Sequence, residues 1–152
     1  MQNKNALSTI FSIGTSDTNH IHVAVEGNDD GKILWTYDLN QTNQRYETAN
    51  AAINALDTWF HVVCVCDNSQ SNDYDKLKVY VNGSISANST DATLNTGTVQ
   101  SITPDESQFE IGSNPHSARK LTGQIDDFLI YNDILTTTEI TRIYNAGKRS
   151  HR

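Results

Sequence analysis

Positive charge, cysteine and long apolar runs are all scarce in this chain of 152 residues. Lysine and arginine together number 11 against 18 aspartates and glutamates, which gives a formal net charge of −7. This balance argues against nucleic acid or an anionic membrane as partner, because both need clustered Lys and Arg. No apolar run is long enough to predict a membrane-spanning helix. The N-terminal stretch MQNKNALSTIF lacks the apolar segment of a signal peptide, so the compartment stays open.

The two cysteines, Cys64 and Cys66, lie two residues apart on a predicted strand. They therefore share one face, at a separation of about 7 Å. That spacing is too long for an easy mutual disulfide. Two ligands without a second pair are also a poor zinc signal. We interpret both cysteines as small buried hydrophobic residues.

The residues that are abundant favour an all-β protein. Hydrophobic residues make up 36% and charged residues 19%, and Asn, Ser and Thr fill much of the rest. A helical protein would be richer in Glu, Lys, Leu and Ala. The length suits one domain with a real core, and we expect residues 1–152 to form that single domain.

Short alternating runs separated by turn signals predict a β-sandwich. The predicted strands cover residues 8–14, 20–27, 32–38, 44–49, 59–66, 77–83 and 108–113, with a last one within 121–132. Alternation places Val23 on the same face as Ile21, and Leu77 on the same face as Val79. The pair Asn82-Gly83 predicts a tight hairpin turn.

One convincing helix follows the last predicted strand. Thr136 and Glu139 have the spacing of a capping box. Ile140, Ile143 and Tyr144 follow at helical spacing. Gly147 predicts the end of the helix.

Several motifs occur together in a familiar order. They are Trp59 with His61, Tyr80 to Gly83, Ile111-Gly112, Gly123 to Asp126, Tyr131-Asn132, Leu135 and Glu139-Ile140. In this order they resemble the laminin-G-like/pentraxin branch of the concanavalin A-like lectin/glucanase superfamily. The resemblance covers about residues 8–147.

The resemblance implies an antiparallel, jelly-roll-like β-sandwich with roles in carbohydrate binding, adhesion or attachment. It often implies a bound calcium ion. Members usually carry further strands before the equivalent of STIFSIG, so the resemblance implies that the family's N-terminal strands are missing here. An uncovered edge strand is a template for pairing. We therefore expect self-association, as a homo-oligomer formed by sheet extension or strand exchange.

Catalysis is not expected. Glucanases of this fold need nearby carboxylates on one strand, as in Glu-x-Asp-x-x-Glu, and no Glu-x-Asp occurs in this chain. The closest run, DESQFE, has the wrong spacing.

Asp126 is the candidate metal ligand. Alternation along the predicted last strand places Asp126 and Asp127 on opposite faces, and in the family pattern Asp126 points inward. A buried carboxylate needs a hydrogen-bond donor, a charge partner or a metal. Two readings stay open, a structural acceptor for loop amides and a calcium ligand.

Aromatic residues give the candidate sugar site. Trp35 and Tyr37 lie on one face of a predicted strand, and Tyr46 is nearby in sequence. Their rings could stack on a sugar, or they could equally belong to the core. Trp59 we assign to the core. His20 and His22 share a strand face and are interpreted as a solvent-facing pair, with zinc as the alternative.

The sequence therefore favours a non-catalytic, lectin-like module that binds carbohydrate or glycoprotein, secreted or at the cell surface. The alternative is a protein-interaction, assembly or adhesion module of the same fold. A glycosidase-related domain is the third reading.

Overall fold

A five-stranded antiparallel sheet is the largest element of the computed structural model, with strands in the order β4-β3-β2-β1-β8. The structure describes residues 8–16, 19–26, 31–39, 42–48, 52–53, 55, 57–71, 73–87, 108–114 and 119–148. The strands of this sheet are β1 (Ser8–Ser16), β2 (Asn19–Val25), β3 (Ile33–Leu39), β4 (Thr42–Glu47) and β8 (Phe109–Ile111). Strands β1 to β4 each pair antiparallel with the next, as expected for successive hairpins.

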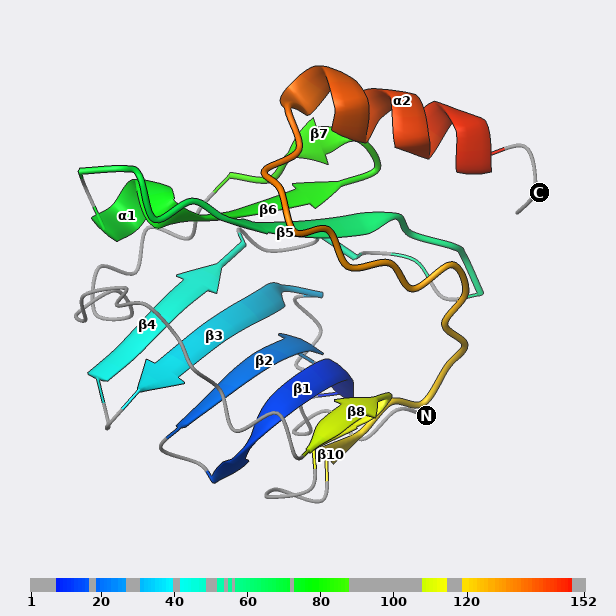
Figure 1. The fold of residues 1–152 in the computed structure, drawn as a ribbon. Helices are drawn as coiled ribbons and strands as arrows, with labels where there is room; N and C mark the ends of the chain where they lie inside the picture. The colour runs from blue at the N-terminus through cyan, green and yellow to red at the C-terminus, as the bar shows by residue number, and fades with distance from the viewer. Residues whose placement is uncertain are drawn as a thin grey trace.

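A smaller sheet lies against the first one, so that the two sheets form two layers (Figure 1). Its strands are β5 (Val62–Cys66), β6 (Leu77–Val81) and β7 (Ser84–Ile85), in the order β5-β6-β7. A one-turn helix, α1 (Asp73–Lys76), leads into β6. A short hairpin of β9 (Ser113–Asn114) and β10 (Arg119–Lys120) follows β8.

The hydrophobic core lies between the two layers. The first sheet contributes Val23, Ile33 and Trp35, and the second contributes Leu77 and Val79. The alternation in β2 and β6 thus predicted the inward faces correctly. The all-β sandwich expected from the sequence is confirmed.

The two cysteines pack against this core as free thiols. Burial raises the pKa of the Cys64 thiol to about 12, so this side chain stays neutral at physiological pH. Both side chains are only partly buried, so their packing on the core agrees with the interpretation as small hydrophobic residues, whereas full burial is not found.

The turn at Asn82-Gly83 forms the predicted hairpin between β6 and β7. Both residues have positive φ, +51° at Asn82 and +78° at Gly83, as a type I′ turn requires. The Asn82 side chain also accepts a hydrogen bond from the backbone N–H of His61 at 3.1 Å. The turn therefore holds the start of β5 as well as its own hairpin.

Helix α2 (Thr137–Gly147) lies on the outer face of the smaller sheet (Figure 1). The predicted capping box is present. The Thr136 hydroxyl accepts from the Glu139 N–H at 3.3 Å, and the Thr136 N–H donates to the Glu139 carboxylate at 2.8 Å. Ile140 is the buried residue of the helix. The predicted stop at Gly147 is one residue early, because Gly147 is still helical and Lys148 caps the helix.

Neither helix in the described part of the chain has the length and apolar character of a membrane span.

His61 joins the sheet to α2. Its ring lies 5.8 Å from the ring of Tyr144, measured between centroids. On the same helix, the Lys148 ammonium lies 5.6 Å from the Tyr144 ring centroid. Burial lowers the pKa of His61 below its usual value of 6.5, because the charged imidazolium loses solvation there.

The free energy of unfolding is therefore expected to depend on pH through His61. The unfolded chain takes up a proton near pH 6.5, before the folded chain does. Stability is thus retained above pH 6.5 and lost as the pH falls below it towards the lower folded pKa. Urea unfolding at pH 7.5 and pH 5 measures this slope. His61→Gln should flatten it, and an identical slope in both proteins would contradict the assignment.

The prediction of a last strand within residues 121–132 is wrong, because this segment does not form a regular strand. Residues 121–136 contain no strand, although they run from β10 to α2 along the side of the sandwich (Figure 1). Asp127 has φ of +51°, which interrupts the two-residue alternation just before Phe128. In the part of the chain that the structure describes, no strand pairs with this segment.

Candidate functional site

Trp35, the first aromatic residue predicted to bind sugar, lies in the core. Its side chain is 5% exposed, and its strand position pairs with Val23 on β2. No face of the indole is open for stacking. This corrects the assignment of Trp35 to a sugar site, and the core alternative holds for this residue.

Tyr37 and Tyr46 lie close to Trp35 in the strand register. Tyr37 is two residues along β3, and Tyr46 is the direct partner of Trp35 on β4. Their strands are described, but their side chains lie outside the described part. The stacking role of these two tyrosines stays a prediction.

Asp126 is exposed and does not point into the sandwich. Its Oδ1 accepts a hydrogen bond from the backbone N–H of Asp127 at 2.8 Å. The inward orientation that the family resemblance implied for Asp126 is wrong, because residues 121–136 do not form a regular strand here. A role as acceptor for a backbone amide is present, with the next residue as donor.

Calcium needs about six to eight oxygen ligands, usually with several carboxylates among them. Within the described residues, no three His, Cys, Asp or Glu side chains gather to hold a metal ion. Asp126 thus belongs to no cluster of three such side chains in that part of the chain. Calcium at Asp126 stays a prediction.

His22 is buried, so the interpretation of a solvent-facing histidine pair is wrong for this residue. Its Nε2 lies 3.1 Å from the Thr9 hydroxyl, and the two histidine rings are 5.9 Å apart between centroids. Thr9 and Ser12 are buried near it along β1, and Ser12 donates to the Ser113 carbonyl at 3.0 Å. This face of β1 and β2 is a structural polar layer.

Two described carboxyl groups have clearly shifted pKa values, and both shifts favour the ionised form. Hydrogen bonds from Ser69 and Gln70 lower the pKa of Asp67. Hydrogen bonds from Thr136 lower the pKa of Glu139. A general acid of a glycosidase needs the opposite shift, so neither group is suited to that role.

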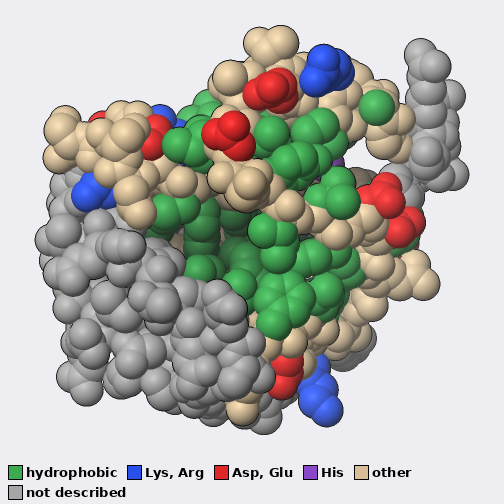
Figure 2. All heavy atoms as spheres, viewed as in Figure 1, with side chains coloured by type: hydrophobic (Ala, Val, Ile, Leu, Met, Phe, Trp, Pro, Cys, Tyr) green, Lys and Arg blue, Asp and Glu red, His purple; other side chains and the backbone are tan. Residues whose placement is uncertain are grey.

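Large apolar side chains are exposed on β8 and on the segment that leads to α2. We call this surface the apolar strip, and it consists of Phe109, Ile111, Leu129, Ile130, Tyr131 and Ile134. Figure 2 shows hydrophobic side chains gathered around a hollow between the two layers. Exposed apolar surface of this extent is typical of an interaction site.

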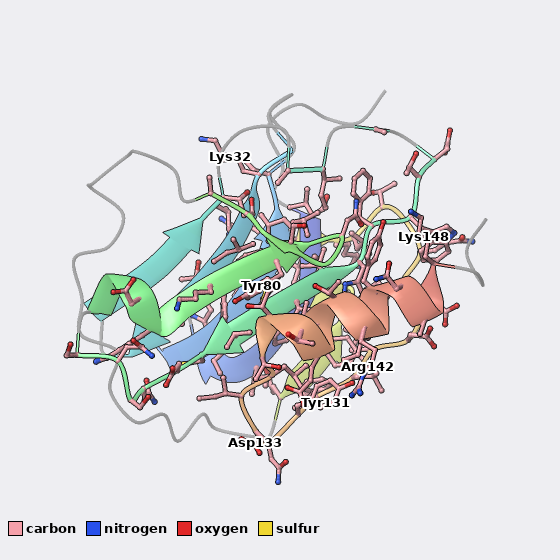
Figure 3. All side chains as sticks on the ribbon, turned by 90° about the horizontal axis from the view of Figure 1, so that it is seen from above. Lys32, Tyr80, Tyr131, Asp133, Arg142 and Lys148 are labelled. Atoms are coloured by element: carbon pink, nitrogen blue, oxygen red, sulfur yellow. The ribbon has the colours of Figure 1, made fainter. Side chains whose placement is uncertain are left out.

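A phenylalanine cluster anchors the strip to the first sheet. Phe128 lies 5.5 Å from Phe11 and 5.8 Å from Phe109 between ring centroids, in edge-to-face arrangements. At its other end the segment turns at Asp133, which lies at the rim of the molecule (Figure 3), and enters α2. The segment is therefore fixed at both ends while Leu129, Ile130 and Tyr131 between them stay exposed.

Trp59 is the exposed tryptophan of the chain, with 43% of its side chain accessible. The assignment of Trp59 to the core is wrong, because the residue lies ahead of β5 and not within it. The signal was present in the sequence, since a tryptophan directly after Asp57-Thr58 stands at the border between a turn and a strand. Trp59 offers an aromatic face that sequence reasoning missed.

Comparisons with known proteins agree with this fold. A family model described as the concanavalin A-like lectin/glucanases superfamily matches residues 1–141. The chain is similar to the CBM40 of the Ruminococcus gnavus IT-sialidase, with a TM-score of 0.64 and 17% identity over 94% of this chain and 77% of that one.

It is also similar to residues 221–444 of an S-layer domain-containing protein from Clostridium thermocellum. That match has a TM-score of 0.44 and 20% identity over 95% of this chain and 65% of that one. No curated protein matches. Because the family model covers most of the sequence, and the two-layer sandwich agrees with it, the chain belongs to the concanavalin A-like lectin/glucanase superfamily.

Proposed function

We propose that this protein is a non-catalytic, lectin-like module that binds carbohydrate. The observation that carries the proposal is the concanavalin A-like sandwich, whose solved neighbour is a carbohydrate-binding module, CBM40. The lack of a Glu-x-Asp strand motif in the sequence supports a binding role without hydrolysis. Since fold alone does not fix function, the proposal rests on a site that can be tested.

Trp59 is the residue we assign to sugar stacking. A sugar ring presents an apolar face that packs on an aromatic ring, with hydroxyl groups at its edges for polar contacts. Trp59 is accessible, whereas Trp35 is not. Tyr37 and Tyr46 remain further candidates from the sequence.

A glycan array tests the proposal. The wild-type protein should bind a defined set of glycans. Trp59→Ala should raise the dissociation constant for these glycans at least about tenfold, which corresponds to about 1.4 kcal/mol of binding free energy. Ile85→Ala, which also shortens an exposed apolar side chain, is the matched control and should bind as the wild type does. A blank array, or equal binding by the Trp59 variant, would sink this site.

The same array decides whether calcium takes part. It is run once with calcium and once with a chelator, and binding lost in chelator would support the metal predicted at Asp126. Binding that is the same in both conditions would remove calcium from the proposal.

A carbohydrate-binding module meets its ligands outside cells or on their surfaces, so we extend the proposal to a secreted or cell-surface location. The second candidate function is a protein-interaction or assembly module, and the exposed apolar strip favours it. The self-association expected from the sequence belongs to this second candidate.

A further inference from the structure

The backbone just after Trp59 is held by two hydrogen bonds to a single residue, Asn82. The His61 N–H donates to the Asn82 side-chain oxygen at 3.1 Å, and the Asn82 N–H donates to the His61 carbonyl at 2.8 Å. These bonds hold both peptide units that flank the His61 Cα, and so they restrict the two backbone dihedrals of His61. Trp59 lies two residues before His61. Asn82 therefore fixes the direction in which the chain leaves the exposed tryptophan.

Helix α2 secures the turn that carries Asn82. The Thr141 hydroxyl donates to the Gly83 carbonyl at 3.0 Å, and the Tyr144 side chain lies directly against the buried Gly83. The Tyr144 ring also lies 5.8 Å from the His61 ring between centroids. Figure 1 shows the turn between β6 and β7 beneath α2. The turn is thus held between the start of β5 and the helix, which makes Asn82 a firm support.

We propose that Asn82 is a positioning residue for sugar binding at Trp59, an inference that rests on the function proposed above. Asn82 does not touch the sugar. It acts through His61 by limiting the directions in which the Trp59 side chain leaves the backbone. A ring that is already held near its bound orientation loses less conformational freedom when a ligand stacks on it, and this raises the affinity.

The residue type at position 82 allows the anchor to be separated from the turn. The first central position of a type I′ turn accepts Asn, Asp or Gly, because each tolerates positive φ. Asn and Asp bring an oxygen that can accept from the His61 N–H, and Gly does not. Asn82→Gly therefore keeps the turn and removes the side-chain anchor, whereas Asn82→Asp keeps both.

The test uses Trp35→Phe as the parent protein, because Trp59 is then the only tryptophan. Without sugar, Asn82→Gly should lower the residual fluorescence anisotropy of Trp59, since the indole moves more freely on the nanosecond timescale. The His61 amide should also exchange its hydrogen faster. With the glycan that the parent binds most strongly on the array, Asn82→Gly should raise the dissociation constant about three- to tenfold. Asn82→Asp should behave as the parent does in all three measurements.

Gly112→Ala is the matched control for a simple loss of stability. Gly112 also has positive φ, but it lies in the turn between β8 and β9 and has open space around it. The substitution should lower the melting temperature and leave the anisotropy of Trp59 and the dissociation constant unchanged. All anisotropies are read well below the melting temperature of each variant.

The outcomes separate the positioning role from the sugar-binding function. Unchanged anisotropy in Asn82→Gly, an equal change in Gly112→Ala, or failure of Asn82→Asp to restore the parent values would each overturn the positioning role. An unchanged dissociation constant in Asn82→Gly would overturn it too. A parent protein that binds no glycan would instead overturn the proposed function, and with it the role of Asn82 in sugar binding.

Discussion

Gly31→Ala is expected to destabilise the protein by about 3 kcal/mol or more, enough to unfold a domain of ordinary stability at raised temperature. Gly31 has φ of +54°, and a residue with a Cβ costs about 1–2 kcal/mol in this conformation. A Cβ at this position would overlap the carbonyl oxygen of Ile53. That contact is impossible, so the backbone of one of the two residues must move.

The movement would also break a hydrogen bond. The Gly31 carbonyl accepts from the Ile53 N–H at 2.8 Å, and both residues are half-buried. Loss of such a backbone hydrogen bond costs about 0.5–1.5 kcal/mol. The adjacent Lys32 carbonyl accepts from the Glu26 N–H at 2.8 Å and holds the end of the β2–β3 hairpin. Chemical denaturation of the purified variant measures the loss.

Two other glycines separate the causes. Gly112 has φ of +78° but nothing within 4 Å of a built Cβ, so Gly112→Ala should show the backbone cost alone. Gly147 is the last residue of α2 and is also open, so Gly147→Ala should be neutral or slightly stabilising through helix propensity. If Gly31→Ala were no worse than Gly112→Ala, the close approach to Ile53 would be refuted.

Local rules predicted the hairpins and the helix because their causes are local. The turn at Asn82-Gly83 needs only residues that tolerate positive φ, and the capping box needs only Thr136 and Glu139. Alternation in β6 likewise gave the inward face, since Leu77 and Val79 are both buried. These features do not depend on which distant strand lies beside them.

The segment 121–136 could not be predicted in the same way, because a strand requires a partner. Its apolar run resembles a strand in the sequence, but no described strand pairs with it. Asp127 has positive φ, so the backbone there is not that of a regular strand, and the carboxylate of Asp126 that was expected to point inward is exposed. Pairing partners are set by tertiary structure, and a pattern of residues along one segment does not contain them.

The candidate sugar site failed at Trp35 for a related reason. Alternation states which residues share a face, but it does not state which face another layer covers. Trp35 shares its face with Val23 across β2 and β3, and the smaller sheet covers that face. Trp59 lies just before β5, and strand alternation does not predict which way a residue outside a strand points.

The two tryptophans should therefore respond in opposite ways to truncation. Trp35→Ala removes the largest side chain of the core cluster and should cost about 3–5 kcal/mol, a fall of about 10 °C or more in Tm. Trp59→Ala should change stability by about 1 kcal/mol or less, because the side chain is largely outside the core. Thermal melting of both variants followed by circular dichroism measures the difference.

Trp35→Phe refines the comparison. The Trp35 indole N–H is buried and has no acceptor among the described residues, and an unmade buried hydrogen bond costs about 1–3 kcal/mol. Phenylalanine keeps an aromatic ring but has no N–H donor. The stability lost with the smaller side-chain volume is therefore partly regained, and the net loss in the free energy of unfolding should stay at about 1 kcal/mol. A small loss of stability in Trp35→Ala together with a large loss in Trp59→Ala would contradict the burial of Trp35 and the exposure of Trp59.

The same pair of variants gives sugar-binding measurements their meaning. Loss of sugar binding in Trp35→Ala would accompany unfolding of the sandwich. It would therefore not show that Trp35 contacts the sugar. Loss of binding in Trp59→Ala at an unchanged Tm would report a ring that touches the ligand. Since Trp35 and Trp59 are the two tryptophans of the chain, their fluorescence also identifies the contact. A sugar that stacks on Trp59 should perturb the emission of Trp35→Phe, which retains Trp59, and leave that of Trp59→Ala unchanged.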